Sequence, residues 1–243
     1  MKRMSKAVLG VVYPYDADID DELRQFLPEG VELRSAHTPA PTEDVTVELL
    51  TRMAGNSDIE EAAMELVPFG PDCIAYACTS GSFVRGVGYD EEISRRIKSK
   101  TGVAATTTST GMVNALRALG IKRVAVGAPY LDEVNETLRR FLEDSGFAVA
   151  KLYGLDIARG SEIGKLSHEE ISRLIRKACT KDADSIFISC TSLRTAAIID
   201  DLERELGKPV VTANQATIWD SLRIMGIKDL PAGLGQLYRI TGS

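Results

Sequence analysis

Residues 72–82 read DCIAYACTSGS, and residues 185–195 read SIFISCTSLRT. In both stretches a short apolar run leads into Cys-Thr-Ser, at Cys78 and again at Cys190. Continuous apolar runs of this length are typical of strands in a parallel sheet that is covered on both faces. The two cysteines stand a little under half of the 243-residue chain apart, which indicates an internal duplication into two similar halves.

Outward from these stretches, apolar runs alternate with helical patterns along the chain. The pattern predicts strands at residues 7–12, 31–35, 72–77, 102–105, 123–127, 148–153, 185–189 and 209–212. It predicts helices at residues 59–66, 89–99, 110–119, 131–144, 168–179, 196–206 and 215–225. Strands that alternate with helices form parallel sheets flanked by helices. We therefore predict an α/β fold with two pseudo-symmetric domains that face each other across a cleft.

Composition and charge argue against several classes of partner. The net charge of the chain is −6, whereas a protein that binds nucleic acid usually carries a basic face. No apolar stretch approaches the roughly 20 residues of a membrane helix. Residues 1–6 are basic, but the apolar run after them is short and leads to no small-residue cleavage site. The sequence predicts a cytoplasmic protein with no nucleic-acid or membrane partner.

The four cysteines are expected to be free thiols in a reducing compartment, and their spacing predicts no metal site. Cys73 and Cys78 are five residues apart, so a strand would point them to opposite faces. Cys73 and Cys179 fall inside a predicted strand and a predicted helix, and we interpret both as buried apolar residues.

In parallel sheets the chemistry lies at the carboxyl ends of the strands. Cys78 and Cys190 occupy such ends, so their thiols are expected to point into the cleft. Backbone N–H groups in the following turns would bind an anion and favour a thiolate. Hydroxyl groups beside the two cysteines are predicted to hold a substrate carboxylate: Thr79, Ser80, Thr191 and Ser192.

Two thiols on either side of a carboxylate-bearing carbon offer two reactions. One thiolate can remove a proton while the other thiol returns one on the opposite face, which is racemisation or epimerisation. Alternatively, one thiolate can add to a carbon–carbon double bond, which permits rotation and then elimination. Neither reaction needs a metal or an organic cofactor, so none is predicted.

Other residues that follow strands are candidates for the walls of the cleft. Tyr130 follows Ala128-Pro129 at one strand end, and Pro14 and Tyr15 follow the first strand. We expect Tyr130 to contact substrate and the backbone at Pro14 to line the cleft, with Tyr15 contributing to its shape. Asn214 follows the last strand and is a further candidate for a polar contact.

The cysteine loops, residues 107–125, Ala128-Pro129-Tyr130 and residues 210–220 resemble the aspartate/glutamate racemase superfamily. Its most similar branches are maleate cis–trans isomerase and arylmalonate decarboxylase. The resemblance runs over nearly the whole chain. It implies a first domain of residues 1–110 plus 215–243, a second of residues 111–214 and an active site between them. It also implies a small mono- or dicarboxylate substrate and a homo-oligomer.

The resemblance assigns roles by position. In the isomerases the position of Cys78 is the nucleophile, that of Cys190 performs acid/base steps, and that of Tyr130 contacts a carboxylate. In the decarboxylases glycine replaces the first cysteine. Both cysteines are present here, which favours an isomerase or racemase. Maleate isomerases carry an asparagine after the first strand, whereas this chain reads Tyr13-Pro14-Tyr15-Asp16.

Two alternatives to the two-thiol isomerase or racemase stay open. One is decarboxylation of a disubstituted malonate, in which Cys190 protonates the enediolate. The other is a non-catalytic protein that binds a carboxylate.

Overall fold

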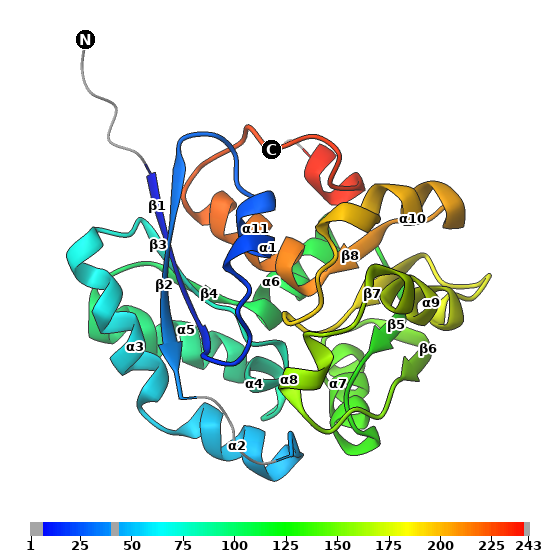
Figure 1. The fold of residues 1–243 in the computed structure, drawn as a ribbon, viewed down its shortest axis with the longest axis horizontal. Coiled ribbons are helices and arrows are strands. Elements are labelled where there is room, and N and C mark those ends of the chain that lie inside the picture. The colour runs from blue at the N-terminus through cyan, green and yellow to red at the C-terminus, as the bar shows by residue number, and fades with distance from the viewer. Residues whose placement is uncertain (1–6, 40–43, 241–243) are drawn as a thin grey trace.

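Two sheets of four parallel strands lie side by side in the computed structural model, which describes residues 7–39 and 44–240 (Figure 1). The first sheet has the order β2-β1-β3-β4 and the second the order β6-β5-β7-β8. Their strands are β1 (Ala7–Pro14), β2 (Val31–Thr38), β3 (Cys73–Tyr76), β4 (Ala105–Thr107), β5 (Arg123–Ala128), β6 (Ala148–Gly154), β7 (Ser185–Ile188) and β8 (Val210–Thr212). Because both halves repeat one strand order, the predicted pseudo-symmetric α/β fold is confirmed.

Helices connect the strands and cover both faces of each sheet. They are α1 (Asp20–Gln25), α2 (Val47–Gly55), α3 (Asp58–Leu66), α4 (Thr79–Phe83), α5 (Tyr89–Thr101), α6 (Thr108–Ala118), α7 (Asp132–Asp144), α8 (Gly160–Ile163), α9 (His168–Ala178), α10 (Ile199–Leu206) and α11 (Ala213–Ile224). Short 3-10 turns are η1 (Val67–Phe69), η2 (Ala196–Ile198) and η3 (Gln236–Arg239). No helix within residues 7–39 and 44–240 is long and apolar enough to cross a membrane.

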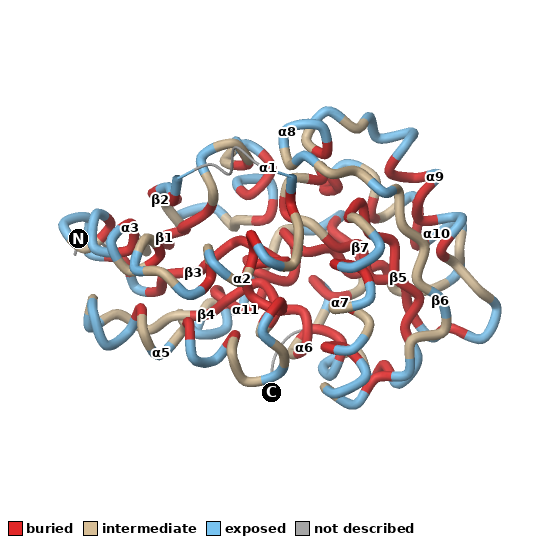
Figure 2. Tube along the Cα trace, turned by 90° about the horizontal axis from the view of Figure 1, so that it is seen from below, coloured by how far each residue is buried: buried red, intermediate tan, exposed pale blue. Residues whose placement is uncertain are grey.

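Side chains of β3 alternate between two apolar clusters, as the period of a strand requires. Ile74, Tyr76 and Cys78 pack in the cluster with α3 and α5. Cys73 and Ala77 belong to the larger cluster, which continues into the second half of the molecule. Cys73 and Cys78 therefore lie on opposite faces, as predicted. Figure 2 shows the buried segments running through the middle of the molecule along β3, α11, β5 and β7.

Helix α11 lies between the two sheets and packs along α6 (Figure 1). Buried hydrogen bonds tie it to the end of the first sheet: the Thr106 hydroxyl donates to Asp220, and the Thr108 and Thr217 hydroxyls are 2.8 Å apart. The Asn114 amide also donates to Asp220. The C-terminal part of the chain is thereby fixed to residues near position 110, while the division into domains at positions 110 and 214 stays a prediction.

Some element boundaries differ from those predicted. Strand β4 begins at Ala105 because α5 continues to Thr101 and Gly102 ends it at φ +75°, a left-handed conformation that favours glycine. Helices α1, α2, α4 and α8 were not predicted, since they are short and are held by contacts with other parts of the chain. The basic segment 1–6, on which the absence of a signal peptide was argued, lies outside the described residues.

Candidate active site

The two cysteine loops, one from each half, meet at a cavity of about 60 Å³. This volume exceeds the ~10–15 Å³ minimum that a cavity needs to hold a single water. Its lining residues come from strand ends, the start of α4, α2 and the α8 turn: Pro14, Asp16, Ala17, Val45, Leu50, Met53, Cys78, Thr79, Ser80, Tyr130, Gly160, Ile163, Cys190, Thr191 and Ser192. Of the residues predicted for the site, all except Tyr15 and Asn214 lie here.

Cys78 lies two residues after the end of β3 and stands at the N-cap of α4, with 8% of its surface exposed. Burial raises the pKa of its thiol, and hydrogen bonds from Tyr76, Gly81 and Ser80 lower it by less. A Cβ on Gly81 would lie 2.6 Å from the Tyr76 hydroxyl and 3.0 Å from the Cys78 sulfur. Glycine at position 81 is therefore what lets the buried tyrosine and the thiol stand together.

Cys190 has a backbone φ of +98°, whereas Cys78 is extended at φ −139°. A non-glycine residue in that region carries strain of about 1–3 kcal/mol, and such strain concentrates at functional sites. Burial raises the pKa of the Cys190 thiol to about 11, against hydrogen bonds from Ser192 and Tyr130 that lower it. The duplicated loops thus hold their thiols in different backbone conformations and different environments.

Tyr130 is buried, with 2% of its surface exposed, and both thiols of the cavity lie within its electrostatic reach. The Ser189 hydroxyl donates to its oxygen at 3.2 Å, which leaves the Tyr130 proton free to point at Cys190 or at a ligand. Burial raises its pKa well above the usual range, so it remains a hydrogen-bond donor.

A direct hydrogen bond joins the two cysteine loops. The Thr191 hydroxyl donates to the Ala77 carbonyl at 3.1 Å, so the residues next to each cysteine are in contact. The Asn214 amide donates to the carbonyls of Thr191 and Leu193 and holds the second loop against α11. Asn214 therefore supports the site from behind and does not line the cavity.

Thr79 carries a hydroxyl with no hydrogen-bond partner among the described residues, although its oxygen is buried. Buried hydroxyls are normally paired, and an unpaired one in a cavity wall is a place for a ligand. The N–H groups of the first turn of α4 have no partner within that helix. Together these donors can hold a carboxylate beside Cys78.

The sequence analysis missed several parts of this site. Tyr76 is two residues before Cys78, and an even offset on a strand places both on one face, which could have identified it. Asp16 lies in the same strand-end segment as Tyr15, but only Pro14 and Tyr15 of that segment were predicted for the site. Val45 and Ile163 reach the cavity from distant loops and left no local signal.

Tyr15 lies outside the cavity: 71% of its surface is exposed, and its ring meets His37 edge-on. Its predicted part in shaping the site has no counterpart among the lining residues. Arg85 donates to the Thr51 carbonyl, and Arg194 to the Asp18 carbonyl, so both are engaged outside the cavity. No group of three or more potential metal ligands occurs within residues 7–39 and 44–240.

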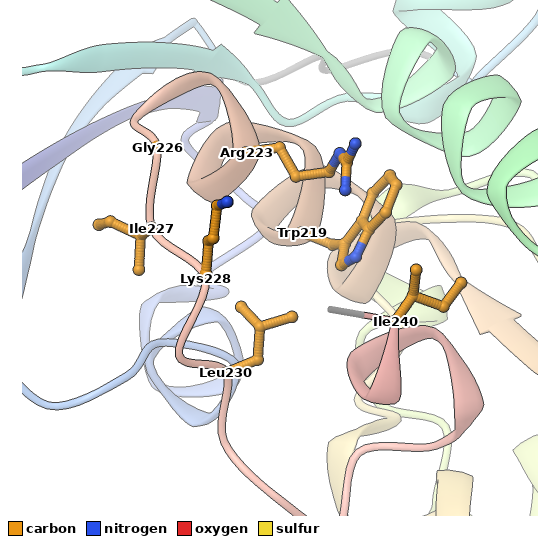
Figure 3. A pocket seen from close by; sticks show the side chains of 7 residues that line it. All are labelled: Trp219, Arg223, Gly226, Ile227, Lys228, Leu230 and Ile240. Atoms are coloured by element: carbon orange, nitrogen blue, oxygen red, sulfur yellow. The ribbon is translucent and has the colours of Figure 1, made fainter. Parts of the chain in front are cut away.

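A second cavity, of about 140 Å³, opens at the end of α11 (Figure 3). It contains none of the predicted site residues. The Arg223 guanidinium lies 4.7 Å from the centre of the buried Trp219 ring. Trp219 is thus a core residue, with one edge on this second cavity.

Known proteins share both the sequence and the fold. The arylmalonate decarboxylase family model matches residues 50–238. Arylmalonate decarboxylase of Bordetella bronchiseptica is 33% identical over 184 residues, covering 74% of this chain and 76% of its own. Maleate isomerase of Nocardia farcinica is 27% identical over 240 residues, 95% of each chain.

The maleate isomerase of Pseudomonas putida S16, solved as a mutant with maleate, has a TM-score of 0.85 at 25% identity and covers 96% of this chain and 97% of its own. The chain is an enzyme, and its maleate isomerase relatives support an isomerase. With most of its length matched by one family model, the chain belongs to the arylmalonate decarboxylase family.

Proposed function

We propose that this enzyme isomerises or racemises a small carboxylate without a cofactor, with Cys78 and Cys190 as its two reactive groups. The observation that carries the proposal is that both thiols line one small cavity beside the unpaired Thr79 hydroxyl. The relatives add weight, because one was solved with maleate and most named relatives are maleate isomerases.

The protonation states follow from the position of the thiols. Burial raises the pKa of each, and a charge on Cys78 opposes ionisation of Cys190. One thiolate and one thiol are therefore the working pair. Cys78 receives donors from Tyr76, Ser80 and Gly81, and it is the thiolate in this mechanism.

Isomerisation of a cis-alkene acid begins when the Cys78 thiolate forms a carbon–sulfur bond at one alkene carbon. The electron pair moves to the neighbouring carbon and its carboxylate as an enediolate, which Thr79 and nearby N–H groups stabilise. The Cys190 thiol gives that carbon its proton and becomes a thiolate, which later removes the proton again. After rotation about the single carbon–carbon bond, the electron pair left on the carbon re-forms the double bond and the Cys78 thiolate leaves.

Racemisation uses the same groups without a carbon–sulfur bond. The Cys78 thiolate removes the proton from the carbon next to the carboxylate, and the same donors stabilise the enediolate. The Cys190 thiol then gives its own proton to the opposite face. Proton exchange with water returns the two thiols to their starting states.

Proton NMR in deuterated water distinguishes these reactions. Fumarate formed from maleate identifies the isomerase, whereas deuterium at the α-carbon of a chiral acid, with loss of optical purity, identifies a racemase. Cys78→Ala and Cys190→Ser are each expected to abolish either reaction. Cys179→Ala, which changes a thiol outside the cavity, is the matched control and should keep full activity. Full activity in either site variant contradicts the two-thiol mechanism.

A second candidate is decarboxylation of a disubstituted malonate, with Cys190 as proton donor. It is favoured by the 33% identity to an arylmalonate decarboxylase. Carbon dioxide release that requires Cys190 and tolerates Cys78→Gly would establish it. Absence of turnover with slow, equal alkylation of all four thiols would instead indicate a carboxylate-binding protein.

A further inference from the structure

Asp16 is the acidic residue among those that line the cavity, and no lysine or arginine is among them in the described chain. Its carboxyl receives no hydrogen bond from another described residue, and burial raises its pKa. Its charge also opposes ionisation of the Cys78 thiol, which places it within electrostatic reach of the reacting groups. A partly buried acceptor that no other described residue engages is therefore available to a ligand.

Gly160 faces this carboxyl from the α8 turn. A Cβ built on Gly160 would lie 2.9 Å from Asp16 Oδ2, closer than a side-chain carbon can stand. Any larger residue at position 160 would press on the carboxyl. The glycine thus leaves Asp16 its place at the cavity wall.

Neighbouring positive charges are engaged elsewhere. Arg159, next to Gly160, pairs with Asp44 at 3.5 Å, and Arg194 donates to the Asp18 carbonyl. A second substrate carboxylate beside Asp16 would meet a like charge with no cation between them, which is unfavourable in a partly desolvated site. A hydrogen-bond donor in the same place would meet an acceptor that no other described residue engages.

Resting on the proposed function, we propose that Asp16 sets substrate choice: the enzyme takes a small monocarboxylate that presents a hydrogen-bond donor where maleate presents its second carboxylate. The hydroxyls and N–H groups beside Cys78 hold the single carboxylate. The Asp16 carboxylate accepts a hydrogen bond from the donor group of the substrate, and the two thiols act on the carbons between that group and the carboxylate. Tyr130, Thr191 and Ser192 line the wall near Cys190, and the other side chains of the wall are apolar: Pro14, Ala17, Val45, Leu50, Met53 and Ile163.

Maleate and its monoamide, maleamate, form a matched pair of probes, since they differ in one group of nearly equal size. Each is titrated as a protectant against iodoacetamide, and alkylation of Cys78 is followed on its peptide by mass spectrometry. This readout measures binding and needs no turnover. The variant is Asp16→Asn, which keeps the shape and removes the charge. Asp18→Asn is the control: it makes the same change two residues away, outside the cavity, at φ +42°, which asparagine tolerates.

We expect the unmodified enzyme and Asp18→Asn to bind maleamate at least about tenfold more tightly than maleate. In Asp16→Asn the preference should shift toward maleate by a similar factor. Equal or tighter binding of maleate by the unmodified enzyme, or no change in Asp16→Asn, overturns the inference, as does failure of both acids to protect Cys78. Preferential binding of maleamate without NMR turnover of any acid would leave the inference standing and refute the proposed function.

Discussion

Replacing Tyr76 with phenylalanine should raise the pKa of Cys78 and leave the fold unchanged. Tyr76 is buried, with 1% of its surface exposed, and its ring packs in the cluster beneath the site. Its hydroxyl is the largest of the hydrogen-bonding influences that lower the pKa of the Cys78 thiol. Phenylalanine keeps the ring and removes only this donor.

The size of the effect follows from the strength of one hydrogen bond to a charged acceptor. Such a bond contributes about 1.5–3 kcal/mol. At 1.36 kcal/mol per pKa unit, its loss raises the pKa by about one to two units. Because thiolates of higher pKa are better nucleophiles, with a Brønsted slope near 0.5, the alkylation rate below the pKa falls by only about 3- to 10-fold.

The assay is the pH dependence of iodoacetamide alkylation of Cys78, measured on its peptide in a Cys190→Ser background. Tyr238→Phe is the control, since Tyr238 is another buried tyrosine whose hydroxyl donates to the Phe26 carbonyl. The pKa should rise in Tyr76→Phe and stay unchanged in Tyr238→Phe. An unchanged or lowered pKa in Tyr76→Phe would refute the assignment of Tyr76 as a positioning residue for the thiolate.

Three further outcomes are expected. Gly81→Ala should destabilise the fold by about 1–3 kcal/mol in urea unfolding and reduce activity, because the new Cβ would press on Tyr76 and Cys78. Adding Tyr76→Phe should restore stability but not activity, so equal stability of the single and double variants would contradict this prediction. The pH profile of kcat/KM should rise with pH as Cys78 ionises, because burial raises the pKa of that thiol, and it should fall only as Cys190 ionises near 11. A profile that is flat between pH 7 and 9 counts against a buried thiolate. Glu22→Ala should lower the free energy of unfolding in urea by about 3 kcal/mol, because the buried Glu22 carboxylate accepts three hydrogen bonds at the start of η2. Glu22→Gln should lower it by less, and equal losses of stability in the two variants would show that the charge is unimportant.

The buried thiol of Cys190 makes the stability of the fold depend on pH. Cys190 has a pKa of about 11 in the folded chain, above the usual value near 8.5 for an exposed cysteine. The folded state therefore binds more protons than the unfolded state between these values, so this contribution to stability is complete below pH 8.5 and is lost as the pH rises toward 11.

Much of the architecture could be predicted from the sequence because its causes are local. Continuous apolar runs specify buried strands, and their alternation with helical patterns specifies parallel connection. Strand polarity then places Cys78 and Cys190 at carboxyl ends, and the repeated Cys-Thr-Ser pairs them across the duplication. The odd spacing of Cys73 and Cys78 was also enough to separate them onto opposite faces.

Tertiary structure alone decided the details that make the cavity selective. The contact of Thr191 with Ala77 and the approach of Gly160 to Asp16 join residues more than a hundred positions apart. No periodicity records such contacts, because they depend on how two completed sheets pack. The left-handed φ of Cys190 likewise breaks the symmetry that the repeated Cys-Thr-Ser predicts. The sequence therefore determined which residues reach the cleft, whereas packing between the halves determined what each one faces there.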